Sequence, residues 1–140
     1  MSERYLRSIR LLAECMQLFE KLSGAHIRQF QLTHAQFDII ATLGNTQGMS
    51  CKELGEKTLI TKGTLTGVID RLEAKKLICR VQCSHDRRRS YVRLTEAGEL
   101  MFAEIFPQVL EHGKQRFNDY DINDFIALEQ QLSKLKNCLQ

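Results

Sequence analysis

Three consecutive arginines, Arg87, Arg88 and Arg89, follow Asp86 and carry the strongest chemical signal in this sequence. The alternating run Tyr91–Leu94 after them is typical of a short strand, so the arginines are predicted to lie at the tip of a β-hairpin. Guanidinium groups at such a tip suit a narrow, negative groove, which is where arginine is favoured on DNA. Alone, such a run is more often a solvated loop, and the preceding segment therefore decides between the two interpretations.

The segment from Met49 to Lys76 has the pattern of two helices joined by a tight turn, a helix-turn-helix. Ser50, followed three residues later by Glu53, fits a capping box, which satisfies exposed N–H groups at a helix start. Thr61 is expected to be the N-cap of the second helix. Apolar residues recur at helical spacing in that helix and predict one buried face: Leu65, Val68, Ile69 and Leu72.

The opposite face of the second predicted helix carries short hydroxyls, basic groups and one glycine: Lys62, Thr64, Thr66, Gly67 and Arg71. Such groups near a helix N-terminus can bond phosphates and base edges while that end enters a major groove. The alternative is the solvated side of an ordinary amphipathic helix. A helix-turn-helix, a strand, a basic tip and a second strand in succession make a winged helix, and this combination favours DNA binding.

Several stretches of the chain resemble the MarR family of transcriptional regulators. Leu32–Phe37 looks like the start of that family's second helix. Residues 61–66, together with Asp70–Glu73, resemble its recognition helix. Residues 86–88, followed by Leu94–Gly98, match the family's wing signature of Asp, any residue and Arg, then Leu-Thr and a Gly. The wing motif is the most specific part of the resemblance, which runs through half of the chain.

The resemblance implies roles for individual residues. In the MarR family an aspartate orients the wing arginine two positions on, which reaches the minor groove, and the matching pair here is Asp86 and Arg88. Lys76 departs from the pattern, because the family usually has a glycine there that ends the recognition helix. The position at which this helix ends is therefore open.

The composition fits one folded domain with an uneven charge distribution. The chain has 140 residues, of which 43% are apolar, and this is enough for a modest core. Residues 51–93 carry eleven Lys and Arg against five Asp and Glu, although the whole chain has a net charge of only +3. Positive charge is thus concentrated where a phosphate-binding surface requires it. Neither a membrane span nor a secretory signal is found, so we expect a cytoplasmic protein that does not enter a membrane.

Apolar stripes mark both ends of the chain. Residues 4–30 carry a stripe that is too wide for one neighbouring helix to cover: Leu6, Ile9, Leu12, Ala13, Met16, Phe19 and Leu22. Near the C-terminus the spacing is that of a coiled-coil seam: Phe125, Leu128, Leu132, Leu135 and Leu139. The seam suits an intramolecular core, but a homodimer built from both terminal helices is favoured, and the resemblance implies it too. A helix from about Thr95 to Arg116 is expected to be bent or interrupted at Pro107.

These elements predict a mainly α fold of the α+β winged-helix type. The chain is expected to form a single MarR-like domain over residues 1–140. Within it, residues 32–94 would form the winged helix-turn-helix that binds DNA. Residues 1–31 and 95–140 would form the helical dimerisation part.

Five cysteines are present, and an odd number without a secretory signal argues against a disulfide framework. Cys79, Cys83 and His85 have the ligand types of a zinc site. On an extended strand, however, residues four apart are separated by about 13 Å, too far for both to bind one zinc. No metal and no cofactor is expected. Cys15 lies in the first helix, like the reactive cysteine of the organic-hydroperoxide-sensing MarR subgroup, but its flanks do not resemble that subgroup. A small buried side chain is therefore favoured over a redox sensor.

The leading hypothesis is a sequence-specific DNA-binding transcriptional regulator, a homodimeric repressor on an inverted-repeat operator. Its partners would be double-stranded DNA and a small aromatic or phenolic effector that releases it, because the family often binds such ligands between the dimer helices and the winged helix. His26, Arg28 and His34 lie where that crevice would be, but each is more typical of a surface residue. The alternatives are a thiol-based redox-sensing regulator that uses Cys15, and a winged-helix protein-interaction module. An enzyme is not expected, because no residue spacing supports a catalytic site.

Overall fold

The computed structural model describes residues 3–82 and 90–140. The predicted wing residues Asp86, Arg87, Arg88 and Arg89 therefore lie outside the described residues. The chain forms two compact units, residues 1–109 and residues 110–140, and each is described by itself.

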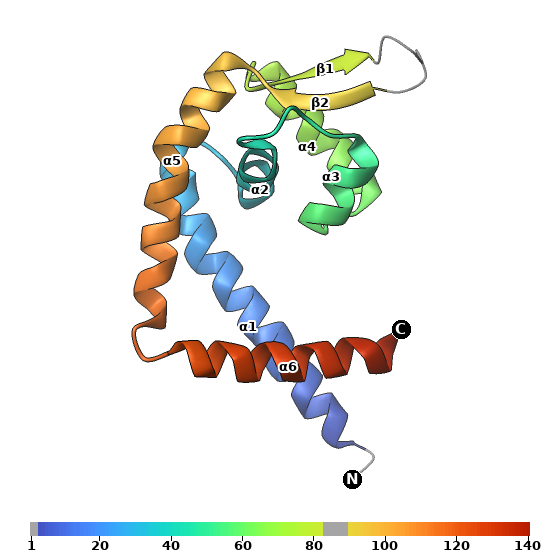
Figure 1. The fold of residues 1–140 in the computed structure, drawn as a ribbon, viewed down its shortest axis with the longest axis vertical. Coiled ribbons are helices and arrows are strands. Elements are labelled where there is room, and N and C mark those ends of the chain that lie inside the picture. Colours follow the sequence, from blue (N-terminus) through green and yellow to red (C-terminus); the bar gives the residue numbers. More distant parts are fainter. Residues whose placement is uncertain (1–2, 83–89) are drawn as a thin grey trace. The chain divides into compact units, whose positions relative to one another are not determined.

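The first unit contains the elements of a winged helix-turn-helix (Figure 1). In chain order they are α1 (Arg4–Ile27), the 3-10 turn η1 (Arg28–Phe30), α2 (His34–Leu43), α3 (Cys51–Thr58), α4 (Lys62–Ala74), β1 (Ile78–Gln82), β2 (Ser90–Leu94) and most of α5 (Glu96–Lys114). The second unit holds the end of α5, the turn η2 (Gln115–Phe117) and α6 (Ile122–Leu139). The predicted fold class, mainly helical with a small sheet, is confirmed.

The two strands form the antiparallel hairpin that the alternating pattern predicts. Ile78 pairs with Leu94 at one end of the ladder, and Gln82 pairs with Ser90 at the other. Met49 adds a short bridge to the free side of β2, because it exchanges backbone hydrogen bonds of 3.0 and 2.8 Å with Val92. This bridge holds the chain that enters α3 against the sheet.

One hydrophobic core joins the helix-turn-helix to the sheet. Its fully buried side chains come from α1, α2, α3, α4 and both strands: Ile27, Ile39, Ile40, Leu43, Leu54, Ile69, Leu72, Ile78 and Val92. Burial of a large aliphatic side chain contributes about 1.5–3 kcal/mol. The recognition helix is thus positioned by the same core that holds the strands.

The start of α5 explains the Leu-Thr-Glu-Ala-Gly pattern after β2. The Thr95 hydroxyl accepts a hydrogen bond of 3.1 Å from the Gly98 N–H and donates one of 2.7 Å to the Lys76 carbonyl. A Cβ at position 98 would lie 2.1 Å from the Leu77 carbonyl oxygen, so only glycine fits there. The pattern therefore packs the helix start against the end of the helix-turn-helix.

Pro107 does not interrupt α5, which is helical from Glu96 to Lys114. The expected interruption is therefore wrong, and the bend expected as its alternative stays a prediction. A proline inside a helix removes one backbone hydrogen bond, to the carbonyl four residues earlier. That carbonyl belongs to Ala103, and both residues are exposed, so water can satisfy the group.

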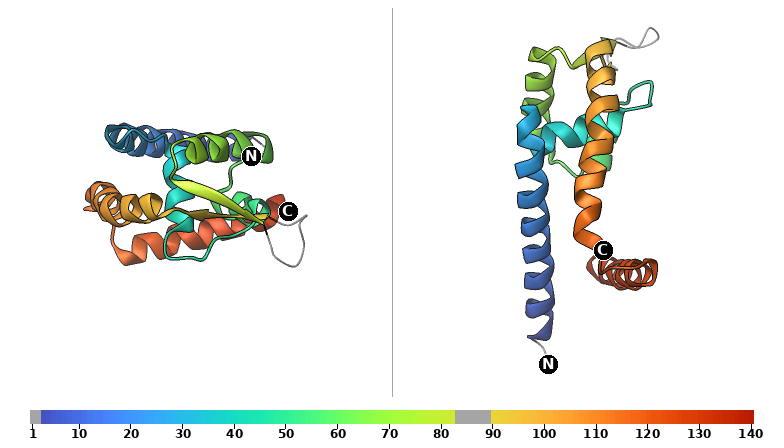
Figure 2. Two further views of the ribbon diagram at one scale, coloured as in Figure 1. Left: turned by 90° about the horizontal axis from the view of Figure 1, so that it is seen from above. Right: turned by 90° about the vertical axis from the view of Figure 1, so that its left-hand side faces the viewer.

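The terminal helices expose most of their apolar side chains. Figures 1 and 2 show α1 extending toward the N-terminus well beyond α2. Its buried residues, Gly24 and Ile27, lie at its C-terminal end. Large exposed apolar residues of α1 are Tyr5, Leu6, Ile9, Leu11, Met16, Leu18, Phe19 and Leu22.

The α6 helix begins at an Asp121–Asp124 capping box and has no buried residue. Its large exposed apolar residues are Ile122, Ile126, Leu128, Leu132 and Leu139. Among the described helices, none is long and apolar enough to cross a membrane.

Candidate nucleic-acid interface

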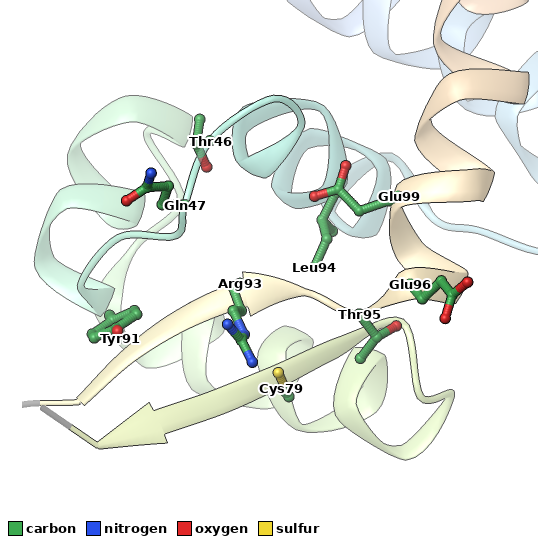
Figure 3. Close-up of a pocket in the computed structure, with 9 residues that line it drawn as sticks. All are labelled: Thr46, Gln47, Cys79, Tyr91, Arg93, Leu94, Thr95, Glu96 and Glu99. Carbon is green, nitrogen blue, oxygen red and sulfur yellow. The ribbon is translucent and has the colours of Figure 1, made fainter. Parts of the chain in front are cut away.

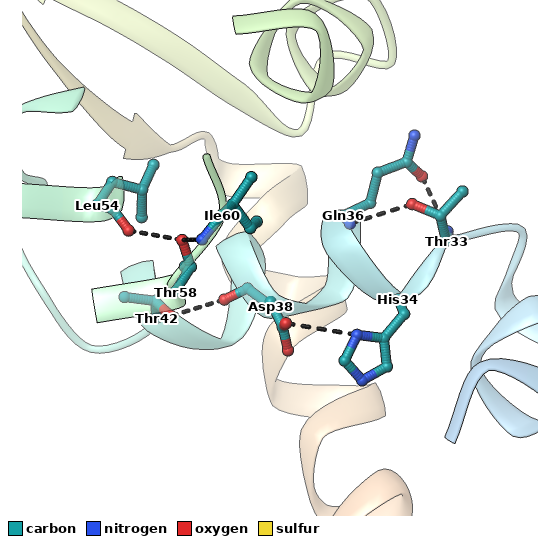
Figure 4. A network of polar contacts seen from close by, with 8 residues as sticks. All are labelled: Thr33, His34, Gln36, Asp38, Thr42, Leu54, Thr58 and Ile60. Carbon is teal, nitrogen blue, oxygen red and sulfur yellow. Dashed lines mark hydrogen bonds and ion pairs between the residues drawn. The ribbon is translucent and has the colours of Figure 1, made fainter. Parts of the chain in front are cut away.

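The turn of the helix-turn-helix is held by side-chain hydroxyls. The Ser50 hydroxyl accepts a hydrogen bond of 3.1 Å from the Glu53 N–H, so the predicted cap of α3 is confirmed. The Glu53 carboxylate accepts from the Ser50 hydroxyl at 3.3 Å, and only half of the expected capping box is therefore formed. At the other end of α3, the Thr58 hydroxyl donates to the Leu54 carbonyl at 2.7 Å and accepts from the Ile60 N–H at 3.4 Å (Figure 4).

The recognition helix α4 has the two faces that its sequence predicts. The core side chains Leu65, Val68, Ile69 and Leu72 are buried. On the other side, Lys62, Thr64, Thr66 and Arg71 are exposed and Gly67 is half-buried. The structure thus brings the predicted DNA-binding residues of α4 onto one accessible surface.

The N-terminus of α4 is open to a ligand. Thr61 is the N-cap residue, as predicted, but its hydroxyl bonds to the Thr64 hydroxyl at 3.2 Å and caps no backbone N–H. A helix N-terminus attracts anions through its N–H groups and its dipole. The side chains in this first turn carry a basic group and hydroxyls but no carboxylate. This end of the helix is therefore suited to a phosphate.

Gly67 has no structural reason to be glycine. No atom of the described residues lies within 4 Å of the place that a Cβ would take. A glycine inside a helix costs about 0.8–1.0 kcal/mol relative to alanine. A position without a side chain on an exposed helix face would allow close approach of a nucleic-acid backbone.

Arg80 has a role that the sequence pattern did not predict beyond its positive charge. Arg80 in β1 donates from Nη2 to Asp70 Oδ1 at 2.7 Å and from Nη1 to a Glu73 carboxylate oxygen. The hydrogen bond to Asp70 is the main reason why the pKa of Arg80 is raised. Both acids belong to α4, so Arg80 neutralises carboxylates that would otherwise repel phosphates. The spacing of Asp70 and Glu73, three apart on one helix face, was the available signal.

The neighbouring Lys75 also serves the fold. Its Nζ donates to the Gln31 carbonyl at 2.6 Å and to Gln36 Oε1 at 3.1 Å. These contacts tie the end of α4 to the start of α2. Gln36 in turn forms a capping box with Thr33 (Figure 4). Lys75 thus supports the structure of the helix-turn-helix, although its side chain is exposed.

A Schellman motif ends α4. The helix ends at Ala74, and Lys76 takes the left-handed conformation, with φ of 62°. The Lys76 N–H bonds to the Glu73 carbonyl and the Leu77 N–H bonds to the Leu72 carbonyl, which is the Schellman motif. Lysine therefore occupies the position where glycine is usual, and the helix ends there all the same.

The three residues expected near an effector crevice differ in exposure. Arg28 is exposed, and its Nε donates to the Gly24 carbonyl at 3.1 Å. His26 and His34 are half-buried, which departs from the expected surface position. His34 Nδ1 lies 3.4 Å from Asp38 Oδ2 (Figure 4). Burial raises the pKa of Asp38, His34 lowers it and Glu20 raises it further, and the net change is upward.

The expectation of a buried Cys15 is wrong for this chain, because its thiol is exposed. The buried residues of α1, Gly24 and Ile27, lie at its C-terminal end and not near Cys15. Cys83 and His85 lie outside the described residues. Within residues 3–82 and 90–140, no group of three or more His, Cys, Asp and Glu side chains is placed to hold a metal ion.

A polar cavity of about 620 Å³ lies on the sheet, between the loop before α3 and the start of α5 (Figure 3). Its lining includes Arg93, Tyr91, Glu96, Glu99 and Cys79. The Arg93 guanidinium bonds to the Cys79 thiol, and this raises the pKa of Arg93. The lining carries one guanidinium and two carboxylates, so its side chains favour neither sign of charge.

An exposed helix with basic and hydroxyl groups, in a helix-turn-helix that shares its core with a β-hairpin, defines a winged-helix DNA-binding protein. The sequence profile of the MarR family matches residues 32–90. An uncharacterised helix-turn-helix transcriptional regulator of Bacillus cereus is 32% identical over 115 residues, which cover 82% of this chain and 74% of that protein. The chain belongs to the MarR family and is a DNA-binding transcriptional regulator.

Two solved structures extend the comparison over nearly the whole chain. BpsR of Bordetella bronchiseptica, described with the regulation of its DNA binding by 6-hydroxynicotinic acid, has a TM-score of 0.80 and 27% identity, over 93% of this chain and 98% of BpsR. NadR in complex with 4-hydroxyphenylacetate has a TM-score of 0.73 and 26% identity, over 89% of this chain and 88% of NadR.

Proposed function

We propose that this regulator acts as a homodimeric repressor on an inverted-repeat operator, and that a small hydroxylated aromatic acid releases it. The observation that carries the DNA-binding part is the exposed face of α4, with Lys62, Thr64, Thr66, Gly67 and Arg71 next to an uncapped helix N-terminus. We assign these residues to the major groove. We assign Arg87, Arg88 and Arg89 to the adjacent minor groove, with Asp86 orienting Arg88. Such a protein acts on chromosomal DNA, and we therefore place it in the cytoplasm.

Exposed apolar helices support the dimer. Both α1 and α6 present large apolar side chains to solvent, although a monomeric soluble protein rarely exposes large contiguous apolar patches. A second copy of the chain is the partner that we propose for these faces. A two-fold dimer would place two recognition helices about one DNA turn apart, roughly 34–36 Å, and would therefore select an inverted repeat.

The two ligand-associated relatives support the effector class. The acids named with BpsR and NadR are both aromatic rings that carry a hydroxyl and a carboxylate. A ligand of this kind would lower DNA affinity if it binds better to a dimer whose recognition helices have the wrong spacing. Titration of an operator complex with each acid, followed by fluorescence anisotropy, tests this. Unchanged affinity at saturating acid would reject this effector class.

The experiment that tests DNA recognition starts from selection of bound sequences out of a random DNA pool. Affinity for the selected operator should fall linearly with salt on logarithmic axes, because phosphate contacts release counterions. Arg71→Ala and Thr64→Ala should each lower operator affinity by about 1–3 kcal/mol if they contact bases. Arg116→Ala, which removes an exposed arginine from η2, is the matched control and should have no such effect. DNA binding that does not weaken with salt would argue against phosphate contacts, and would favour a winged-helix protein-interaction module instead.

The exposure of Cys15 favours a second candidate, a thiol-based redox switch on the same scaffold. A sensor thiol must be accessible to the oxidant, and the Cys15 thiol is exposed in the single chain. Peroxide should then weaken operator binding of the wild type but not of Cys15→Ser. Equal responses of the two proteins would exclude Cys15 as the sensor.

A further inference from the structure

Leu59, in the turn between α3 and α4, combines two unfavourable features. Its side chain is 87% exposed. Its backbone is left-handed, with φ of 61°, a conformation in which a bulky L-residue is an outlier and which costs roughly 1–2 kcal/mol. Neither feature contributes to the core. A leucine in this position therefore needs a reason outside the folded chain.

The turn itself does not need leucine. The left-handed residue lets the position 59 N–H bond to the Gly55 carbonyl at 2.9 Å, which ends α3. The Thr58 hydroxyl holds both sides of the turn through Leu54 and Ile60 (Figure 4). Glycine or asparagine would adopt the same backbone at lower cost. Local structure thus requires the conformation and leaves the side chain unexplained.

The other left-handed positions show the contrast. Among the described residues, the non-glycine positions with positive φ are Gln31, Asn45, Leu59 and Lys76. All except Leu59 have polar side chains, which solvent accommodates without penalty. Leu59 is also more exposed than any other large hydrophobic residue in the described part of the chain.

The position of Leu59 indicates its partner. It lies two residues before Thr61, the N-cap of the recognition helix, between the exposed Lys57 and Lys62. A leucine flanked by lysines suits a polyanion that has apolar patches better than it suits an apolar protein surface. Duplex DNA has such patches in the thymine methyl groups of the major groove and in its deoxyribose carbons.

We propose that Leu59 makes an apolar contact with duplex DNA beside the N-terminus of α4, and so extends the interface from the recognition helix to the turn. The proposal rests on the proposed DNA interface of α4. Burial of the leucine side chain against DNA would offset the conformational cost of the turn in the complex, while the free protein carries that cost.

The test compares three variants of the full chain on the operator selected by the wild type. Leu59→Asn keeps a residue that tolerates the left-handed backbone and removes the apolar contact, so affinity should fall about tenfold. Leu59→Met keeps the apolar side chain and should bind within about twofold of the wild type. Leu100→Gln, at a 67% exposed leucine of α5, is the matched control and should bind as the wild type does. The thermal midpoint of Leu59→Asn should equal or exceed that of the wild type, so that lost binding does not reflect lost folding.

Two sources of apolar carbon are separated by the same operator with deoxyuridine in place of thymidine. If the thymine methyl is the partner, this substitution weakens the wild type but not Leu59→Asn. If deoxyribose is the partner, the difference between the two proteins persists on both DNAs. Wild-type affinity of Leu59→Asn for the operator would overturn the proposal while the DNA interface of α4 still stands. A wild type that binds no DNA would instead remove the proposed interface, and the role of Leu59 with it.

Discussion

Some single residues in this protein adopt backbone conformations that lower its stability, and Lys76 is one of them. Its left-handed backbone completes the Schellman motif after α4, and its carbonyl accepts the Thr95 hydroxyl. Both contacts use the backbone only. The lysine side chain therefore adds strain to this position without a compensating contact in the motif.

Lys76→Gly should raise the free energy of unfolding by up to about 1 kcal/mol, because glycine adopts positive φ without steric cost. The neighbouring Lys75→Gly should lower it, since Lys75 is right-handed and bonds to Gln31 and Gln36. Urea unfolding of both variants measures the difference. Loss of stability in Lys76→Gly would show that the lysine side chain makes a contact of its own.

Asp38 should make the stability of the folded protein depend on pH. It lies next to His34, one of the residues expected near an effector crevice. Its folded pKa is raised above the ordinary 3.8, chiefly by burial. The ionised form is therefore disfavoured in the folded state. The free energy of unfolding falls as pH rises from the unfolded pKa through the folded pKa, because the folded protein must then carry the charge. The cost is fully present above that pKa and absent below 3.8.

Asp38→Asn should accordingly stabilise the protein at neutral pH relative to the wild type, because it removes a half-buried charge. The gain should shrink as the pH falls through the raised pKa and vanish at the acid end. Thermal unfolding of both proteins across this range checks the sign. A gain that does not vary with pH would indicate that the substitution acts through packing.

At the scale of elements, the recognition helix is held by a strand and by another helix. Arg80 of β1 binds Asp70 and Glu73 on one side of α4, and Lys75 ties its end to the start of α2. Exposed ion pairs contribute only about 0–1 kcal/mol each to stability. Their larger effect here is electrostatic, because the acids of α4 are neutralised beside the surface that we propose for phosphate contact.

Gly67→Ala should separate folding from DNA binding. The added methyl meets no atom of the chain, so stability should rise by about 1 kcal/mol through helix propensity. If DNA lies against this position, operator affinity should fall by about 1–3 kcal/mol, the range for overpacking.

Gly113→Ala in α5 is the matched control, because a Cβ there also meets no atom within 4 Å. It should leave operator affinity unchanged. Paired thermal unfolding and binding isotherms measure both effects. A Gly67→Ala protein that binds the operator as tightly as the wild type would move the interface away from this face of α4.

At the scale of the whole molecule, α1 and α6 each expose an apolar face that the packing of the single chain does not explain. The double substitution Leu128→Asp and Leu132→Asp places charges on exposed apolar positions of α6. Charged groups are costly to bury without a partner, so the variant should be monomeric if this face is the dimer interface. Ser133→Asp on the same helix is the control and should remain dimeric.

Sedimentation velocity measures the oligomeric state of these variants. The monomeric variant should also lose affinity for a two-site operator and keep its affinity for a single half-site. A wild type that sediments as a monomer, or a double variant that stays dimeric, would contradict the proposed role of α6.

The sequence by itself determined features that depend on neighbours along the chain. Helical spacing predicted the buried face of α4, and the Ser50 cap followed from local hydrogen bonding. Alternation predicted strand β2. These features are local, because a helix face or a cap involves residues only a few positions apart.

Only the tertiary structure decided which distant groups meet. It placed Arg80 on two acids of α4, Lys75 on α2, and Gly98 against the Leu77 carbonyl. It also showed that Cys15 is exposed, since a stripe in the sequence indicates an apolar face but not what covers it. The physical reason is that burial and ion pairing depend on the packing of segments far apart in the chain, which no local pattern encodes.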